Sequence, residues 1–194
     1  MMDHEKEIKR ISELLAGLDA RDLDIDGFKP SAVLVPIQFI DGKVSLLFTK
    51  RTGIVEHHKH QVSFPGGSLD DGENTLQCAL RESQEEVGLE PGDVRILGRL
   101  DDIFTITSFT VTPYVGAIPY PYDFVSSEQE ITEIFTVSVE HLLKPEIFRA
   151  EKYEAPWGDI PIYYYEAGQH TIWGATARIL TQFLQLAYGK EIDT

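Results

Sequence analysis

The 194-residue sequence has a single cysteine, Cys78, and no long apolar run. One thiol cannot form a disulfide within the chain, so cysteine usage favours a reducing compartment. No apolar run reaches the roughly 18 residues that a membrane-spanning helix requires. The first ten residues, MMDHEKEIKR, are too charged for a secretory signal. We therefore expect a cytoplasmic protein without a membrane partner.

Basic residues are also scarce. The chain has 17 lysines and arginines against 32 aspartates and glutamates, which gives a formal net charge of −15 at pH 7. A surface this acidic repels nucleic acid and anionic lipid, because both bind proteins largely through cationic side chains. The composition therefore predicts no nucleic-acid partner. The acidic composition suits a protein that binds metal ions and uses them to contact phosphate groups.

The sequence does contain enough apolar material for a core. Hydrophobic residues make up 42% of the chain, and no repeat, low-complexity segment or linker interrupts it, so we predict one domain over residues 1–194. Strands mixed with two substantial helices predict an α/β fold, a mixed-sheet α/β/α sandwich. The predicted elements are a helix over about 4–18, strands over 31–40 and 43–51 joined by an Asp41-Gly42 hairpin turn, a helix ending at Gly88, strands near 94–105, 109–118 and 133–139, a short helix over 140–148, a loop, a strand over 160–166, and a terminal helix opened by His170 or Thr171.

The most informative stretch is residues 64–89, FPGGSLDDGENTLQCALRESQEEVGL. On a helix with about 3.6 residues per turn, Glu82, Glu85 and Glu86 lie within roughly 100° of one face. Like charges at this spacing repel each other, whereas a divalent cation would hold them together, because Mg²⁺ seeks oxygen ligands. A solvated acidic surface is the ordinary alternative for such a face. The fixed spacing of the whole stretch favours a metal site.

That spacing places Glu73 five residues after Gly67, and an Arg-Glu pair seven residues further on. The pattern resembles the Nudix box, G-x5-E-x7-R-E-U-x-E-E-x-G-U, in which U is an apolar residue. Ser83 stands where an aliphatic residue is usual, a departure that affects packing and leaves the acidic residues intact. We expect Arg81 to pair with Glu73, which lies about two helical turns away.

The resemblance implies a hydrolase that cleaves a nucleoside diphosphate linked to another group, with Mg²⁺ or Mn²⁺ as cofactor. The implied metal ligands are Glu82, Glu86 and Glu85, with the Gly66 carbonyl as a further donor. Glu82 is alternatively the base that deprotonates the attacking water. In some members of the family the base comes from a separate loop, for which this chain offers Glu128 and Glu130. Arg81 completes the implied catalytic set of Glu82, Glu85, Glu86 and Arg81.

The segment before the box resembles the coenzyme A (CoA) diphosphatase branch of the family. That branch typically reads L-L-T-x-R, a basic residue, then H-x-G-Q-V-x-F-P-G-G. This chain has LFTKR at 47–51, then His58, then QVSFPGG at 61–67, and its IWGATARIL at 172–180 resembles the last helix of the branch. The implied reaction splits the diphosphate of CoA into 3′,5′-ADP and 4′-phosphopantetheine. The implied substrate contacts are Arg51, Lys50, His58, Phe64 and Gly67.

Two positions depart from the branch pattern: Glu56 stands where Arg is usual, and His60 where Gly is usual. Losing a fixed positive charge weakens the expected grip on the 3′-phosphate of CoA. Two other functions therefore stay open, a Nudix pyrophosphatase for ADP-ribose or NADH and a catalytically silent domain that binds a nucleotide. A zinc site at His57, His58 and His60 is a weaker alternative, since no second ligand pair is near. The apolar face of the N-terminal helix is compatible with a homodimer.

Overall fold

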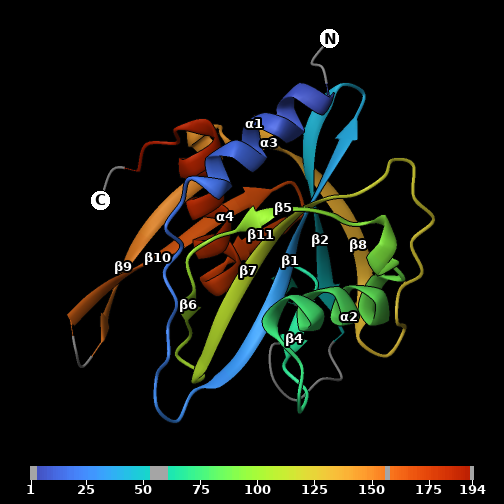
Figure 1. The fold of residues 1–194 in the computed structure, drawn as a ribbon. Coiled ribbons are helices and arrows are strands. Elements are labelled where there is room, and N and C mark those ends of the chain that lie inside the picture. The colour runs from blue at the N-terminus through green and yellow to red at the C-terminus, as the bar shows by residue number, and fades with distance from the viewer. Residues whose placement is uncertain (1–3, 53–60, 156–157, 193–194) are drawn as a thin grey trace.

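The computed structural model describes residues 4–52, 61–155 and 158–192 (Figure 1). Its helices are α1 (His4–Ala16), α2 (Thr75–Val87), α3 (Val139–Leu142) and α4 (Gly174–Tyr188), with 3-10 turns at Pro91–Asp93 and Pro145–Ile147. Its strands are β1 (Lys29–Ile40), β2 (Lys43–Arg51), β3 (Val62–Ser63), β4 (Gly66–Ser68), β5 (Arg95–Arg99), β6 (Ile103–Phe104), β7 (Phe109–Ala117), β8 (Ile131–Ser138), β9 (Phe148–Ala155), β10 (Gly158–Ala167) and β11 (His170–Trp173). Within the described ranges, no helix has the length and apolar character needed to cross a membrane.

Strand β1 lies at the centre of the larger sheet, whose order is β3-β2-β1-β7-β5, with β4, β6 and β8 pairing β1, β7 and β2. β1 pairs parallel with β7 and antiparallel with β2, so the sheet is mixed, as predicted. The predicted hairpin is confirmed: Ile40 pairs with Lys43, and Asp41 and Gly42 have φ angles of 50° and 76°. Two-residue hairpin turns with two positive φ angles favour this residue pair, because aspartate and glycine tolerate the left-handed region.

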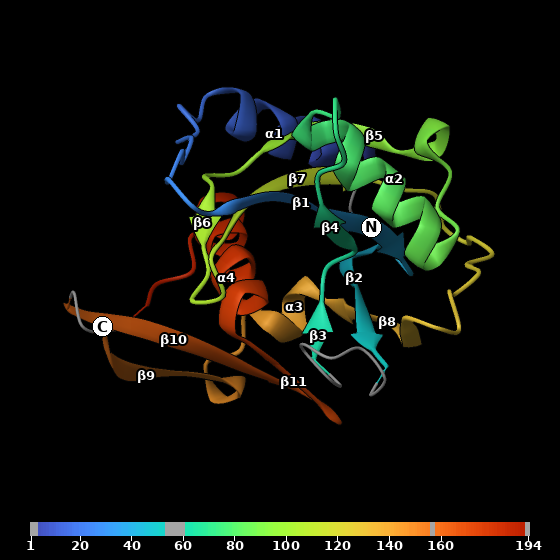
Figure 2. The same ribbon diagram turned by 90° about the horizontal axis from the view of Figure 1, so that it is seen from below.

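Helices cover both faces of the larger sheet. α2 packs on one face, over β1 and β4, while α4 and the smaller sheet β11-β10-β9 lie on the other face (Figure 2). Side chains of β1 alternate accordingly, since Leu34 belongs to the apolar cluster with Val87 of α2, and Val35 belongs to the larger cluster with Phe183 of α4. The α/β sandwich predicted from the sequence is confirmed.

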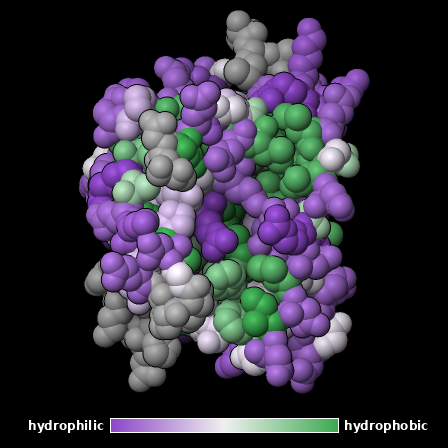
Figure 3. All heavy atoms as spheres, turned by 90° about the vertical axis from the view of Figure 1, so that its left-hand side faces the viewer, coloured by the Kyte–Doolittle hydropathy of each residue, from purple (hydrophilic) through white to green (hydrophobic). Residues whose placement is uncertain are grey.

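Helix α1 packs along the edge strand β5 and ends slightly earlier than the predicted helix. Ile8, Ile11 and Leu15 from its apolar face are buried in the main core. Gly98 permits this approach, because a Cβ at that position would lie 2.5 Å from the Leu15 Cβ. The apolar face that suggested a homodimer is therefore largely covered by the chain itself. The segment after α1 borders a hollow in the molecular surface (Figure 3).

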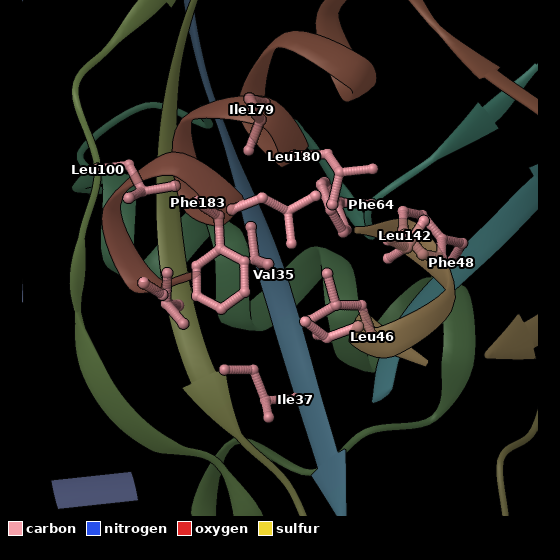
Figure 4. Packing of buried hydrophobic residues seen from close by; sticks show 14 of the residues in the cluster. Val35, Ile37, Leu46, Phe48, Phe64, Leu100, Leu142, Ile179, Leu180 and Phe183 are labelled. Atoms are coloured by element: carbon pink, nitrogen blue, oxygen red, sulfur yellow. The ribbon is translucent and has the colours of Figure 1, made fainter. Parts of the chain in front are cut away.

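The main core fills the space between the larger sheet and α4 (Figure 4). Leu180 and Phe183 from α4 are fully buried against Val35 and Ile37 from β1. Burying an apolar side chain of this size contributes about 1.5–3 kcal/mol to stability. This packing fixes α4 against the sheet, and it leaves the other face of β1 free for α2.

Two predictions about the C-terminal third were wrong. The terminal helix was expected to open at His170 or Thr171, but His170–Trp173 form strand β11 and α4 begins at Gly174. Ile172, which matched the helical spacing, is fully buried in this strand. β9 was expected to be a loop, yet it pairs with β10 over its whole length. Both segments are strands because a neighbouring strand satisfies their backbone groups, a tertiary contact that overrides local preference.

Candidate active site

Helix α2 carries the acidic face, and both of its ends are capped. The Asn74 side chain accepts a hydrogen bond from Gln77 N at 2.9 Å, and the Gln77 side chain accepts one from Asn74 N at 3.0 Å, which makes a capping box. Gly88 ends the helix at φ 68°, as predicted. Ser83, the departure from the box pattern, is fully buried and donates its hydroxyl to the Ala79 carbonyl at 2.6 Å. The helix therefore tolerates this serine without an unpaired hydroxyl.

Two glycines of β4 let α2 lie close to the sheet. A Cβ at Gly67 would lie 2.4 Å from Oε1 of Glu82, so this carboxylate rests directly on the glycine backbone. A Cβ at Gly66 would lie 2.3 Å from the carbonyl oxygen of Ala32 in β1. Because no side chain fits at either position, the glycine pair brings the strand backbone up to the carboxylates of α2.

Glu86 is the most buried carboxylate of the acidic face, with 1% of its side chain exposed. Its Oε1 accepts a hydrogen bond from Nη1 of Arg51 at 3.1 Å, and its Oε2 accepts one from Gly66 N at 3.2 Å. The pKa of Glu86 is raised to about 7. Burial is the main cause, the negative charges of Glu82 and Glu130 contribute to the rise, and Arg51 opposes it. A buried carboxylate with a raised pKa beside other acids is typical of a functional site.

Glu82 and Glu85 share a second arginine. Nη1 of Arg81 donates to Glu82 at 2.9 Å and to Glu85 at 3.2 Å. The Nε and Nη2 atoms of Arg81 donate to the two carboxylate oxygens of Glu73 at 2.9 and 3.0 Å, which confirms the predicted pair. Glu82 is 16% exposed and burial raises its pKa, whereas Glu85 is 59% exposed at the edge of the cluster. Glu82, Glu85 and Glu86 thus form one acidic cluster, held by two arginines.

Arg51, at the end of β2, connects this cluster to the loop before β8. Besides Glu86, it reaches Glu130, whose Oε2 lies 3.3 Å from Nη2 of Arg51. The backbone of the same loop is fixed to the end of β2, because Thr52 N donates to the Glu130 carbonyl at 2.8 Å. Glu128 of this loop is exposed. Of the two loop acids singled out in the sequence, Glu130 is the one that lies beside the cluster.

A NUDIX domain model matches residues 28–163, a span that contains the whole acidic cluster. The chain belongs to the Nudix family. It is 34% identical over 170 residues to the uncharacterized Nudix hydrolase NudL of Cronobacter sakazakii, a match that covers 84% of this chain and 84% of that protein. It is 35% identical over 145 residues to Nudix hydrolase 3 of Caenorhabditis elegans, covering 72% of this chain and 60% of that protein.

Two solved structures share the Nudix fold. A MutT/nudix family protein from Enterococcus faecalis matches with a TM-score of 0.57 at 14% identity, over 97% of this chain and 81% of that one. The Ap4A hydrolase of Caenorhabditis elegans, in a binary complex, matches with a TM-score of 0.51 at 23% identity, over 57% of this chain and 80% of that one. These likenesses show the fold alone. From the family match, the protein is a Nudix hydrolase, a diphosphatase that acts on phosphoric anhydrides.

Nudix hydrolases typically depend on a divalent metal ion, and the chemistry of this donor set suits one. The negative charge of Glu82 raises the pKa of Glu86, so the two carboxylates repel each other in a way that a cation would relieve. Across residues 4–52, 61–155 and 158–192, no three His, Cys, Asp or Glu side chains converge as a finished metal cage. Guanidinium groups hold the carboxylates instead, with Arg81 on Glu82 and Arg51 on Glu86. A cation would therefore take over oxygens that the two arginines now contact.

Of the other predicted substrate contacts, Gly67 lies at the Nudix cluster, against Glu82, whereas Lys50 and Phe64 do not. Side chains alternate along β2, so Lys50 lies on the same face of the sheet as Phe48, away from α2. Arg51 lies on the opposite face and contacts Glu86 of α2. The prediction that Phe64 contacts the substrate is corrected: its side chain is 2% exposed and stacks on Phe48 with ring centroids 4.8 Å apart, so it belongs to the core. The predicted contact His58 lies outside the described residues, and so do Glu56, His57 and His60.

Sequence reasoning missed the bridge that Arg51 makes between Glu86 and Glu130. These partners are 35 and 79 positions away from Arg51 along the chain. No local periodicity signals a contact over such separations, because the sheet and not the helix brings the three residues together. All three residues lie in charged segments that also carry a motif or a candidate base. That shared feature is the signal that would have suggested the bridge.

Proposed function

We propose that this Nudix hydrolase cleaves the diphosphate of CoA or a CoA derivative, giving 3′,5′-ADP and 4′-phosphopantetheine. One observation carries the proposal. Arg51, the last residue of the segment that resembles the CoA branch, donates to Glu86 of the Nudix box at 3.1 Å. Gly66 and Gly67, at the end of the second such segment, border the same carboxylates. The motif that points to CoA and the motif that points to diphosphate hydrolysis thus meet in one place.

Glu82 and Glu86 are the proposed ligands for Mg²⁺ or Mn²⁺, with Glu85 at the edge and the Gly66 carbonyl as a further donor. When bound, such an ion neutralises phosphate oxygens and lowers the pKa of a coordinated water. Arg51 has two roles in this proposal. It balances the charge of Glu86 before the ion arrives, and its forked guanidinium then suits a phosphate oxygen pair of the substrate.

The proposed reaction is attack of a water oxygen on one phosphorus of the anhydride. The bond from that phosphorus to the bridging oxygen breaks, and the leaving phosphate takes the electron pair. A carboxylate accepts the proton that the water loses. Glu82 and Glu130 are the candidates for this base. Burial raises the pKa of Glu82, which favours it as a proton acceptor.

A substrate panel tests the choice of CoA. Initial rates would be measured with Mg²⁺ for CoA, dephospho-CoA, ADP-ribose and NADH, and adenosine products would be quantified. We expect the highest kcat/KM for CoA, because a contact to the 3′-phosphate adds binding energy that the other three substrates lack. A preference for any substrate without the 3′-phosphate overturns the proposal, and a preference for ADP-ribose or NADH favours that alternative.

The variant Glu86→Gln tests the site itself. We expect kcat to fall by about 10²–10³-fold, the usual cost of removing one electrostatic contact from a reaction centre. The variant should remain folded, because glutamine keeps the shape of a carboxyl group that burial already disfavours as an anion. Glu90→Gln is the matched control, since Glu90 contacts Gln84 on the exposed side and not the cluster. If wild type and Glu86→Gln are equally inert on every diphosphate tried, the protein is a silent nucleotide-binding domain.

A homodimer and a cytoplasmic location remain proposals. The burial of Ile8 and Ile11 within the chain removes the main structural reason for a dimer through α1. Light scattering on the purified protein would give the subunit number directly.

A further inference from the structure

The loop between β7 and β8 passes the C-terminal end of α2 and is hydrogen-bonded to it (Figure 1). The Val125 N–H donates to the Val87 carbonyl at 3.0 Å, and the Ser127 N–H donates to the Glu86 carbonyl at 3.0 Å. Within the loop, the Glu130 N–H donates to the Ser127 carbonyl at 2.9 Å. The backbone that carries Glu130 is therefore attached, through one turn, to the backbone that carries Glu86.

The same loop is also attached to the residue that follows β2. That residue, Thr52, is buried, with 4% of its surface exposed. Its N–H donates to the Glu130 carbonyl at 2.8 Å, and its hydroxyl donates to the Gln129 carbonyl at 2.9 Å. Because both α2 and the end of β2 hold the loop, the backbone of Glu130 has a fixed place beside the acidic cluster.

An irregularity in the sheet directs Arg51 towards this place. The register of β2 with β8 shifts between Lys50 and Arg51, and such bulges redirect a side chain. The guanidinium of Arg51 lies between two carboxylates: Nη1 donates to Oε1 of Glu86 at 3.1 Å, and Nη2 donates to Oε2 of Glu130 at 3.3 Å. One arginine is thus shared by a proposed metal ligand and a loop acid.

The two carboxylates differ in their surroundings. Glu86 is 1% exposed. A divalent ion on Glu86 would repel the guanidinium of Arg51, because like charges interact strongly where water is excluded. Glu130 is 48% exposed and is not one of the proposed metal ligands. Its contact with Arg51 can therefore persist when an ion occupies Glu86.

We propose that Glu130 is a positioning residue for Arg51. It keeps the guanidinium beside the cluster when a divalent ion takes over Glu86, so that Arg51 meets a phosphate oxygen of the substrate instead of turning to solvent. This inference rests on the proposed function. It assigns Glu130 to Arg51 and leaves Glu82 as the proposed base.

The charge of Glu130 gives this role a distinctive signature. Its negative charge reaches the cluster, since it contributes to the raised pKa values of Glu82 and Glu86. Acting directly, that charge repels an anionic substrate, so its removal would strengthen phosphate binding. Acting through Arg51, it supports the contact with the substrate, so its removal would weaken phosphate binding. The direct effect and the positioning effect have opposite signs.

Isothermal titration calorimetry with methylenediphosphonate, a diphosphate analogue without a hydrolysable bridge, measures this effect without turnover. The full chain is titrated at two saturating Mg²⁺ concentrations, so that a change in metal affinity does not register as a change in analogue affinity. Glu130→Gln should weaken analogue binding about three- to fivefold, the size of a partly exposed ion pair. Glu128→Gln is the matched control, because it removes an equal charge from an exposed residue of the same loop, and it should not weaken binding.

Arg51→Gln completes a double-mutant cycle. In the Arg51→Gln background, Glu130→Gln should strengthen analogue binding, because only the direct repulsion remains to be removed. If Arg51→Gln does not fold, the comparison of Glu130→Gln with Glu128→Gln stands alone. In hydrolysis assays, Glu130→Gln should raise KM more than it lowers kcat, whereas loss of a base would lower kcat.

Three outcomes overturn the inference. The first is analogue binding by Glu130→Gln that equals or exceeds that of the wild type. The second is an equal weakening by Glu130→Gln in the Arg51→Gln background, and the third is an equal weakening by Glu128→Gln. Absence of analogue binding by the wild type contradicts the proposed metal site and this inference together. A failure of CoA hydrolysis leaves the calorimetry unaffected, because the analogue resembles only the diphosphate.

Discussion

Glu7 and Glu86 are both buried beside an arginine, yet their pKa values shift in opposite directions. Glu7 accepts two hydrogen bonds from Arg10, at 2.6 and 2.9 Å, and a third from the Tyr188 hydroxyl at 3.1 Å, and these donors lower its pKa. Glu86 has one contact from Arg51 and one from a backbone N–H, so burial dominates and raises its pKa. Glu7, which has a structural role, accepts enough hydrogen bonds to stabilise its ionised form. Glu86, which is proposed for chemistry, accepts too few to offset its burial, so a cation would stabilise its ionised form.

This contrast predicts a pH dependence for Glu7→Gln. The variant should lose about 1–3 kcal/mol in the free energy of unfolding at pH 7, because charge-assisted hydrogen bonds are of this size. The folded-state pKa of Glu7 lies below its ordinary value of 4.5, so ionised Glu7 stabilises the fold above about pH 4.5. That contribution is lost as the pH falls through the lower folded-state pKa. Urea unfolding at several pH values should therefore show the gap between wild type and variant closing in acid.

Glu13→Gln is the control for this experiment, since Glu13 lies on the same helix in an exposed pair with Lys9 at 3.7 Å. It should change stability by about 0.5 kcal/mol or less at any pH. A gap between wild type and Glu7→Gln that stays constant from pH 7 into acid would contradict the assignment of the effect to ionised Glu7.

At the scale of elements, α2 must hold three mutually repelling glutamates on one face. Its stability comes from its ends and its inner side. The capping box of Asn74 and Gln77 satisfies backbone N–H groups at the start, and Gly88 closes the last turn. Cys78 and Ala79 are fully buried against β1, where small side chains allow close packing. The caps therefore offset part of the repulsion that the acidic face imposes on the helix.

Asn74→Ala should lower the free energy of unfolding by about 1 kcal/mol, because it removes the acceptor for the Gln77 N–H. For a chain of this length, such a loss corresponds to a Tm decrease of about 2–4 °C. Differential scanning calorimetry measures the change. Asn74→Asp keeps an acceptor at the cap and should stay close to wild type; equal loss in both variants would show that the cap is not the cause.

At the scale of the whole molecule, one apolar cluster joins the larger sheet to the smaller one. It includes Leu46 of β2, Tyr165 of β10, Ile172 of β11 and Phe183 of α4. Tyr165 also bonds through its hydroxyl to Thr181 at 2.8 Å. An apolar cluster shared in this way couples the two sheets, so we propose that the chain unfolds as one domain.

Magnesium should raise the Tm of this single transition. A cation that binds the folded acidic cluster and not the unfolded chain stabilises the fold by mass action, by about 2.7 kcal/mol when its concentration is 100 times Kd. The expected shift is several degrees at millimolar Mg²⁺, measured by calorimetry against KCl of equal ionic strength. Glu86→Gln should reduce the shift. An unchanged melting curve would contradict the metal site, and two separated transitions would contradict the single domain.

Several local features followed from the sequence because nearby residues determine them. The Asp41-Gly42 turn, the end of α2 at Gly88 and the pair of Arg81 with Glu73 all involve partners on one hairpin or one helix edge. The errors arose where distant strands decide the conformation. The charged strand β9 has no apolar alternation to reveal it, and Ile172 fits a helix or a strand until β10 is placed beside it.

The sequence by itself determined the acidic face of α2, the glycines that face it and the family to which both point, since spacing along one helix and one loop sets these. Only the tertiary structure decided that Arg51 joins Glu86 to Glu130 and that Phe64 belongs to the core. These features depend on which strands pair and which side of each strand faces a helix. Such pairings join residues far apart in the chain, and local patterns do not record them.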